Sequence, residues 1–195
     1  MFGYRKLNAG DARSFGEHVV RLSPDDRRSR FAGTVSDREI HRYCASLDWT
    51  RTTVIGFFDD GVIRAAVELR MDAAAGSAEA AFSVERDFQG KGIGSALMRR
   101  IVTVAQNSGI TRLRVFCLPE NWRMRALLAR FSAESEVNID EVAAAIQLRP
   151  ADPLSLAQES FDDGSGYLPI LFERWYTGMM SALMPSSVPV ERRAA

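Results

Sequence analysis

One stretch of the sequence, residues 79–95, most limits what this chain can fold into. It reads EAAFSVERDFQGKGIGS: an apolar run, a short polar turn, a cluster of three glycines and the start of an amphipathic segment. This order predicts a strand that passes through a glycine turn into a helix beginning at Ser95. Because the first amides of a helix have no partner within it and the helix dipole favours negative charge there, the junction predicts an anion-binding site.

The spacing of the glycines excludes two common phosphate loops. A P-loop places four residues between its first glycine and a Gly-Lys-Ser/Thr triplet, and the segment at Gly90-Lys91 lacks that frame. The dinucleotide fingerprint requires its third glycine at the position of Ser95. What remains is QGKGIG at 89–94, where glycines let the backbone turn tightly and approach a phosphate. For three glycines alone, a surface turn with a helix cap is the alternative.

The elements around this loop match the order of a known family. QGKGIG follows the pattern Gln/Arg-x-x-Gly-x-Gly and resembles the coenzyme A pyrophosphate loop of the Gcn5-related N-acetyltransferase (GNAT) superfamily. A strand with an acidic residue precedes the loop, and an amphipathic helix follows it. A further strand at 112–118 then ends at Pro119 and leads into another helix. The block from Glu79 to about Phe131 is similar to the core of the superfamily in order and spacing.

The resemblance implies an α+β fold, with a mixed, largely antiparallel sheet flanked by helices and a splayed parallel pair of strands at the coenzyme A cleft. The residues agree with this. Runs rich in β-forming residues at 52–58 and 62–70 are joined by Asp59-Asp60-Gly61, which is a strong hairpin signal. The strand at 77–84, the helix after it and the strand at 112–118 predict a parallel pair with a right-handed crossover.

The segment before the hairpin is predicted to hold a short strand at 4–7 and three helices. The helix N-caps are predicted at Asp11, Ser23 and Ser36, the last within a capping box. In the superfamily, the first helices flank the acceptor cleft. Residues 22–31 also resemble the corresponding region of bacterial protein acetyltransferases and their stand-alone relatives.

The remainder of the chain is predicted to close the domain and extend it. Residues 137–148 are expected to form a hairpin, as the resemblance implies, although the alanine run within them equally suits a helix. The domain organisation is then a GNAT domain at 1–150, a helical extension packed on it at 151–184 and a flexible tail at 185–195. The amphipathic stripe at 167–183 is expected to dock onto the domain, with a homodimer contact as the alternative.

Composition limits the classes of function. Of the 195 residues, 46% are hydrophobic, and 25 basic side chains balance 25 acidic ones. This suffices for one domain with a sizeable core, and it gives no argument for a nucleic-acid or anionic-membrane surface. No signal segment or membrane-spanning window is evident, so a cytoplasmic location is expected. Two scattered cysteines and two histidines predict neither a disulfide framework nor a metal site.

The resemblance implies that acetyl-coenzyme A binds as a co-substrate between the splayed strands. The pantetheine arm would pair with the strand edge at Phe82, Ser83 and Val84, and an amide near Val84 would polarise the thioester carbonyl as an oxyanion hole does. The residues implied for the pyrophosphate are Gln89, Gly90, Lys91, Gly92, Ile93, Gly94 and Ser95. Asn121, at the end of the next strand, matches the family's polar contact to the pantetheine arm.

Glu79 is the candidate general base. It lies ten residues before Gln89, at the place where protein lysine acetyltransferases of this superfamily carry a glutamate that accepts the proton of the amine, directly or through a water. A carboxylate in a mostly apolar strand beside a cleft is expected to be partly desolvated, which suits a base. The alternatives are a Glu79 that simply faces water and Glu68, on the preceding strand, as the base.

One position departs from the pattern of the family. Many members carry a tyrosine seven residues beyond the asparagine as the acid that protonates the thiolate, and Leu128 occupies this position here. Water or another residue then has to protonate the thiolate, or the protein is not a competent enzyme. Cys117 is either a nucleophile near the acyl group or a packing residue. Trp49, Phe88 and Trp122 are either core residues or lining of an acceptor pocket.

The sequence therefore favours an N-acetyltransferase that moves an acetyl group from acetyl-coenzyme A to an amine. The acceptor is a protein lysine or a small-molecule amine. The sequence does not distinguish the two, because the early helices and loops that set acceptor specificity contain no recognisable motif. A catalytically weak or inactive regulator that binds acetyl-coenzyme A is the alternative. A partner-binding module that acts through the C-terminal helix is the third hypothesis.

Overall fold

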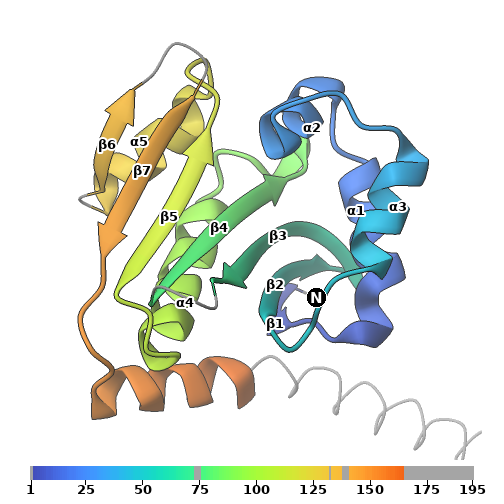
Figure 1. Cartoon of the computed structure of the whole chain (residues 1–195). Coiled ribbons are helices and arrows are strands. Elements are labelled where there is room, and N and C mark those ends of the chain that lie inside the picture. Colours follow the sequence, from blue (N-terminus) through green and yellow to red (C-terminus); the bar gives the residue numbers. More distant parts are fainter. Residues whose placement is uncertain (1, 73–75, 132, 138–140, 165–195) are drawn as a thin grey trace, which may run out of the picture.

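A computed structural model describes residues 2–72, 76–131, 133–137 and 141–164, which form one seven-stranded sheet with helices on both faces (Figure 1). The strands are β1 (Phe2–Lys6), β2 (Thr52–Asp59), β3 (Val62–Met71), β4 (Ser77–Val84), β5 (Arg112–Cys117), β6 (Glu134–Val137) and β7 (Val142–Gln147). The helices are α1 (Ala12–Val20), α2 (Pro24–Phe31), α3 (Asp37–Ala45), α4 (Ile93–Asn107) and α5 (Trp122–Arg130), followed by a helix at 153–164.

The strand order is β1-β2-β3-β4-β5-β7-β6, and all neighbouring strands are antiparallel except β4 and β5. This confirms the predicted mixed, largely antiparallel sheet. The hairpin at 59–61 is also confirmed, because Asp60 and Gly61 have φ angles of 48° and 77°. Two consecutive positive φ angles are typical of the tight turn that matches the twist of a hairpin.

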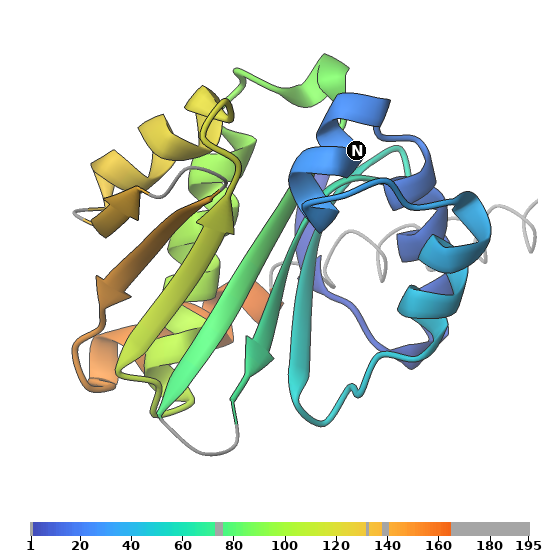
Figure 2. The same cartoon turned by 45° about the horizontal axis from the view of Figure 1, so that its top comes forward.

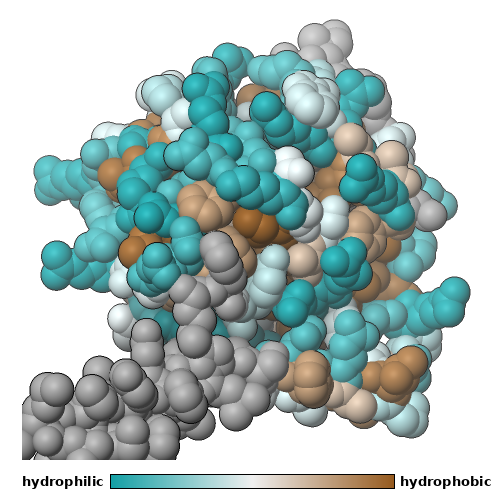
Figure 3. Space-filling model, turned by 180° about the vertical axis from the view of Figure 1, so that it is seen from behind, coloured by the Kyte–Doolittle hydropathy of each residue, from teal (hydrophilic) through white to brown (hydrophobic). Residues whose placement is uncertain are grey.

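The sheet divides the core into two layers. On one face, α4 buries Leu97 and Ile101 against residues of the central strands. On the other face, α1 and α3 bury Phe15 and Ile40 against Val54 and its neighbours. α4 lies behind the sheet in Figure 1, and the opposite view shows that this side of the molecule is covered mostly by hydrophilic side chains (Figure 3). None of the described helices is long and apolar enough to cross a membrane.

The parallel pair opens into a V. β4 and β5 pair over three residues, Ser77–Glu79 with Arg112–Arg114, and then diverge (Figure 2). β5 pairs instead with β7 along its whole length. The part of β4 from 80 to 84 therefore has β3 on one side and no strand on the other, which leaves an open edge in the middle of the sheet.

All three predicted N-cap positions, Asp11, Ser23 and Ser36, are confirmed, but Asp11 makes no side-chain bond to an amide of α1. The Ser23 hydroxyl accepts from a backbone amide of α2, and Ser36 forms a capping box with Glu39. α1 does begin after Asp11, but its carboxylate accepts hydrogen bonds from the Arg5 guanidinium at 2.7 and 2.8 Å. This charge-assisted pair is stronger than a bond to one helix amide.

The closing hairpin is confirmed as β6 and β7, with its first strand earlier than predicted. β6 covers Glu134–Val137, and residues 138–140 lie outside the described part. The helix alternative for the alanine run is wrong, because β7 pairs with β5 from Val142 to Gln147. Pairing with β5 and β6 on its two edges and burial of Val142, Ala144 and Ile146 in the core outweigh the helix propensity of alanine in β7.

The helix at 153–164 rests on β1 and α4 through polar contacts. Lys6 of β1 pairs with Asp163 at 2.8 Å, and Arg100 of α4 pairs with Asp162 at 3.3 Å. Its apolar side chains Leu154 and Phe161 remain exposed. The predicted stripe at 167–183 and the tail at 185–195 lie outside the described residues.

Candidate functional site

The glycine turn lies where it was predicted, but the helix after it begins at Ile93 and not at Ser95. Gly92 is the N-cap, and Gly90 and Gly92 have φ angles of 72° and 81°, a conformation that L side chains rarely adopt. These two glycines complete the turn before the third glycine is reached. Gly94 therefore already lies in the helix, which the cluster alone did not reveal.

The start of α4 offers free backbone donors. The Ala96 amide bonds to the Gly92 carbonyl at 3.0 Å, so the amides of Ile93, Gly94 and Ser95 come before the first bond of the helical ladder. Three unpaired N–H groups at the positive end of a 15-residue helix attract an anion. The local geometry thus has the properties that a phosphate site requires.

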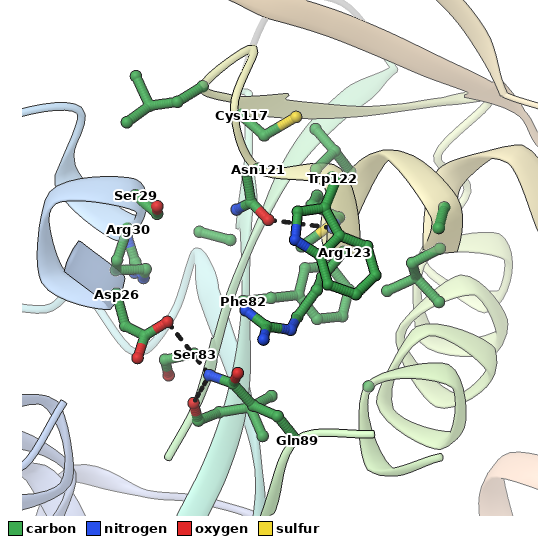
Figure 4. A pocket seen from close by; sticks show the side chains of 18 of the residues that line it. Asp26, Ser29, Arg30, Phe82, Ser83, Gln89, Cys117, Asn121, Trp122 and Arg123 are labelled. Carbon is green, nitrogen blue, oxygen red and sulfur yellow. Dashed lines mark hydrogen bonds between the residues drawn. The ribbon is translucent and has the colours of Figure 1, made fainter. Parts of the chain in front are cut away.

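A cavity of about 640 Å³ lies in front of this helix start and between the splayed strands (Figure 4). We call it the main cavity. The predicted cofactor residues that line it are Phe82, Ser83, Val84, Gln89, Gly90, Gly92, Gly94, Ser95 and Asn121. Two others do not line it: the Ile93 side chain is buried in the core, and Lys91 is exposed with its Nζ 5.2 Å from the centroid of the Phe88 ring.

The backbone of β4 faces the main cavity with its hydrogen-bonding groups. The register places Val84 opposite Ala65 of β3, and the amide of the next residue, Glu85, donates to the Arg64 carbonyl at 3.0 Å. In an antiparallel ladder, successive residues turn their N–H and C=O groups to opposite sides. Phe82 and Val84 therefore direct theirs away from β3, toward the open edge.

Two amide side chains fix the ends of the main cavity. Gln89 donates from Nε2 to the Val84 carbonyl at 3.0 Å and to the Asp26 carboxylate at 3.1 Å, which ties the glycine turn to β4 and α2 (Figure 4). Asn121 accepts from the Met124 amide at 3.1 Å and so caps α5. Its side chain stands at the wall that faces α2.

Charged and aromatic side chains form the outer walls of the main cavity. Arg123 and Arg130 of α5 line one side. The Arg28 guanidinium of α2 lies 3.7 Å from the Glu120 carboxylate across the mouth. Trp122 is 65% exposed and lines this cavity, so it is not a core residue. Its ring lies 4.8 Å from the Arg123 guanidinium carbon, which leaves a flat aromatic surface at the entrance.

The other two candidate aromatics differ from Trp122. Phe88 is partly buried, packs against the core beneath α4 and also lines the main cavity. Trp49 packs against the core layer beneath α1 and α3. Of the three side chains, Trp122 is therefore the one with a large exposed surface beside the cavity.

A second cavity of about 300 Å³ adjoins the main cavity, and both are lined by Arg30, Ala81 and Cys117. We call it the side cavity. Its other lining includes Glu79 of β4, Glu68 of β3 and Glu141, next to β7. The side cavity lies on the sheet face that α2 and α3 cover, because Glu68 and Ala81 are register partners on that face.

Glu79, the predicted base, is exposed in the side cavity rather than desolvated. Its register neighbours are Arg70 of β3 and Arg114 of β5. These arginines pair with other carboxylates, Arg70 with Glu68 at 3.1 Å and Arg114 with Asp72 at 3.5 Å. Both neighbouring arginines are thus paired with other carboxylates, and the Glu79 carboxylate is open to the cavity.

Glu68, the alternative base, is buried and fully occupied. Its carboxylate accepts from Arg30 at 2.7 Å, from the Tyr43 hydroxyl at 2.6 Å and from Arg70 at 3.1 Å. Burial raises the pKa of Tyr43 to about 12, so that hydroxyl remains a donor at neutral pH. Three donors occupy this buried carboxylate and leave no oxygen directed at an amine, so we interpret Glu68 as a structural residue.

The two positions tied to thiolate chemistry are both buried. Leu128 packs into the core beneath the sheet, so this position supplies no acid. Cys117 ends β5 between the two cavities, and burial raises the pKa of its thiol. The neutral thiol is a weak nucleophile, which favours the packing interpretation.

Sequence reasoning gave no role to a buried histidine beside the main cavity. His18 of α1 is completely buried, with Nε2 at 2.9 Å from the Ser83 hydroxyl and Nδ1 at 3.1 Å from the Glu85 carboxylate. Its spacing from Phe15 and Val19 on one helix face was a signal that it points inward. The described residues contain no group of three side chains that could hold a metal ion.

Comparison with known proteins shows which proteins this chain is similar to. Acetyltransferase Pat of Mycolicibacterium smegmatis is 33% identical over 86 residues, which cover 44% of this chain and 26% of that protein. The chain thus matches about a quarter of the length of this curated relative.

Three solved structures share the fold. The GNAT domain of S. lividans PAT aligns with a TM-score of 0.65 at 24% identity, over 74% of this chain and 89% of that one. A cAMP-binding acyltransferase from Mycobacterium smegmatis aligns at 0.56 and 25% identity, over 83% and 50%. A PaiA N-acetyltransferase from Thermoplasma acidophilum in complex with coenzyme A aligns at 0.57 and 18%, over 75% and 99%.

The family model of the acetyltransferases adds the decisive match. It covers residues 19–132, more than half of the chain, from α1 to the end of α5. This range contains the open edge of β4, the glycine turn and the start of α4, which together line the main cavity. The chain therefore belongs to the acetyltransferase (GNAT) family.

Proposed function

We propose that this protein transfers an acetyl group from acetyl-coenzyme A to an amine. The observation that carries the proposal is the joint placement of two backbone donor sets around one cavity: the free amides at the start of α4 and the open edge of β4. A long thiol cofactor with a phosphate group at one end needs such a pair. The CoA complex of PaiA, which shares the fold, agrees with this.

Different residues around the main cavity would bind different parts of the cofactor. The amides of Ile93, Gly94 and Ser95 would hold the pyrophosphate. The backbone of Phe82 and Val84 would pair with the pantetheine arm, and one of these amides would polarise the thioester carbonyl. The positive charges of Arg123 and Arg130 on α5 suit further phosphate.

The side cavity would receive the amine. It meets the main cavity at Ala81 and Cys117, beside the β4 edge on which the thioester would rest. Glu79 would take a proton from the ammonium group, directly or through a water, and so make the nitrogen nucleophilic. The acetyl carbon then forms its bond to nitrogen, and the bond to sulfur breaks. Since Leu128 is buried, the thiolate has to obtain its proton elsewhere.

The carboxylates of the side cavity favour a cationic acceptor. Glu68 is neutralised by Arg30 and Arg70, whereas Glu79 and Glu141 are not paired with either arginine. An ammonium group is attracted to this end of the cavity. A protein lysine and a small amine both satisfy the requirement, and we propose an amine of one of these two kinds.

Binding and transfer are tested separately. Calorimetric titration with acetyl-coenzyme A should give micromolar affinity, and release of free thiol should accelerate in the presence of a suitable amine or lysine peptide. No binding up to millimolar concentrations would show that the glycine turn is not a cofactor site. Binding without transfer to any amine would favour the second candidate, a regulator that binds acetyl-coenzyme A. Two observations favour this candidate: Leu128 is buried and supplies no acid, and Glu79 is exposed to solvent.

A further inference from the structure

A hydrogen-bonded chain of three side chains adjoins the main cavity and has no part in the proposed transfer. The Ser83 hydroxyl lies 2.9 Å from Nε2 of His18, and Nδ1 of the same ring lies 3.1 Å from Oε1 of Glu85. Serine, histidine and carboxylate thus follow one another in the order that activates a nucleophilic serine.

The protonation states suit that role. Burial lowers the pKa of His18, against the effect of Glu85, so the imidazole is neutral near pH 7. Burial opposes ionisation of Glu85, but the His18 contact and the charges of Arg21 and Arg64 keep its pKa below the ordinary value. An ionised Glu85 accepts from Nδ1–H, which leaves the Nε2 lone pair facing the Ser83 hydroxyl. That hydroxyl also lies 3.5 Å from the Ala66 carbonyl, a longer contact, and has to turn its proton to Nε2 for the transfer.

The carboxylate end of the chain is held firmly. Glu85 accepts from Arg21 at 2.9 Å and from Arg64 at 3.0 Å, and Arg21 also donates to the Ile63 carbonyl at 2.6 Å. These bonds fix Oε1 toward His18, whose ring is completely buried. These contacts hold the imidazole in one orientation, and the carboxylate favours the tautomer with its hydrogen on Nδ1.

The serine end of the chain lies at the cavity. Ser83 lines the main cavity between Phe82 and Val84, whose backbone groups face the open edge (Figure 4). Its side chain is on the same sheet face as Ala81, where the two cavities meet. Under the proposed function, the thioester carbonyl rests on this part of β4, which brings its carbon close to the Ser83 hydroxyl.

We propose that Ser83 is a nucleophile that takes the acyl group from acyl-coenzyme A as an ester, with His18 as general base and Glu85 as the residue that orients His18. The inference rests on the proposed function, because that function places the thioester in the main cavity. It gives the protein a covalent acyl-enzyme and, when no amine is present, a slow thioesterase activity.

The atoms balance in two half-reactions. Ser83 Oγ bonds to the thioester carbon while its proton moves to His18 Nε2; the carbon–sulfur bond breaks, and the thiolate takes that proton and leaves as a thiol. The amine, deprotonated by Glu79, or a water deprotonated by His18 then attacks the ester carbon. The carbon–oxygen bond breaks, and the proton that the attacking nitrogen or water loses in this step passes through His18 Nε2 to Ser83 Oγ. His18 thus supplies the acid that Leu128 cannot.

The test is acid-quenched intact-protein mass spectrometry after mixing the whole chain with acetyl-coenzyme A and no amine. We expect one acetyl group per chain, mapped to the peptide that contains Ser83, and a burst of one equivalent of free thiol. Ser83→Ala should lose both, whereas Ser29→Ala, at a cavity serine outside the hydrogen-bonded chain, should keep both. Glu85→Gln should slow the burst by about 10- to 100-fold.

Two controls keep the outcomes distinct. Calorimetry with free coenzyme A must show unchanged affinity in Ser83→Ala, because the hydroxyl is not needed to bind the cofactor. Ser83→Cys restores a nucleophile beside His18 and should give an acid-stable thioester adduct. It therefore tests the chain even if Glu85→Gln, which changes a carboxylate held by two arginines, prevents folding.

Each result decides the matter. An adduct in Ser83→Ala, or a modified Cys117, overturns the inference. A wild-type protein that binds acetyl-coenzyme A and acetylates an amine without adduct or burst also overturns it, and the proposed function then stands as direct transfer. Failure to bind coenzyme A rejects the proposed function itself. An adduct that only water resolves supports the inference and replaces amine transfer by hydrolysis.

Discussion

The main cavity and the side cavity meet at Ala81 but are built from different parts of the chain. The main cavity takes its donors from backbone, at the start of α4 and along the open edge of β4. The side cavity takes its character from charged side chains, of which Glu68 and Glu79 are examples. A local sequence pattern forms the main cavity, whereas packing between residues far apart in the sequence forms the side cavity. Variants in each cavity therefore test whether this difference in construction is also a difference in function.

Glu79→Gln tests whether the side cavity supplies catalysis alone. The amide keeps the shape of the side chain but does not accept a proton from an ammonium group, so kcat for amine transfer should fall about 10²- to 10⁴-fold. The affinity for coenzyme A, measured by calorimetry, should not change, because Glu79 does not line the main cavity. Glu141→Gln, in the same cavity, is the matched control. Equal kcat in Glu79→Gln and wild type would remove Glu79 from the mechanism.

Arg30→Met tests whether the side cavity depends on its buried ion pair. The side chains of Arg30 and Glu68 are 8% and 4% exposed, so removal of the guanidinium leaves the buried Glu68 without its buried cation, with only Tyr43 and the exposed Arg70 as donors. The free energy of unfolding in urea should fall by about 3–5 kcal/mol. Arg28→Met, which breaks the exposed pair with Glu120, should cost less than about 1 kcal/mol. Similar losses in both variants would show that burial of the pair does not matter.

The ion pair of Arg30 and Glu68 shows why the role of Glu68 could not be predicted from the sequence. Arg30 and Tyr43 reach Glu68 across 38 and 25 residues, from two helices to a strand. No periodicity or spacing connects such residues, so Glu68 looked like a rival base although the fold neutralises it. The glycine turn was readable because Gly90 and Gly92 lie next to the strand and helix that they join. Only the helix start was misplaced, since three glycines do not reveal which one ends the turn.

The sheet followed from the sequence for the same reason. The hairpin at Asp60-Gly61 and the capping box at Ser36 are local signals, and both are confirmed. Asp11 takes the predicted N-cap position of α1, but Arg5, six residues away, and the Asn8 amide occupy its carboxylate in place of a helix amide. Departures from prediction thus arise where a distant side chain outweighs a local preference.

Gly92→Glu tests whether the main cavity depends on backbone conformation. The substitution places a side chain at a φ of 81° and a negative charge in front of the free amides. We expect the affinity for coenzyme A to fall at least about 100-fold, or about 3 kcal/mol. Gly109→Glu is the matched control, because Gly109 has a φ of 75° and equally open surroundings but lies at the other end of α4.

The two glycine variants should lose similar stability, since both store the strain of a left-handed side chain, about 1–2 kcal/mol. Loss of coenzyme A affinity should appear in Gly92→Glu alone. If Gly109→Glu weakens binding as much, the effect comes from general destabilisation of α4, and the backbone account of the main cavity fails.

The pH dependence of stability tests His18, the buried side chain that contacts Ser83 of the main cavity. Burial lowers the pKa of His18 below its ordinary value of 6.5, so the unfolded chain binds a proton at a higher pH than the folded chain does. Above pH 6.5 both states are neutral and His18 contributes nothing to the pH dependence. As the pH falls below 6.5, the unfolded state is favoured, by up to about 1.4 kcal/mol per pH unit.

Urea unfolding at several pH values between about 4.5 and 7.5 measures this slope. The lower limit keeps Glu85, whose pKa is lowered, ionised in the folded state. His18→Gln should abolish most of the slope, while His41→Gln, at the other histidine of the chain, should retain it. An unchanged slope in His18→Gln would mean that another group titrates in this range. Loss of the slope would show that a neutral imidazole, the form needed beside Ser83, is built into the folded state.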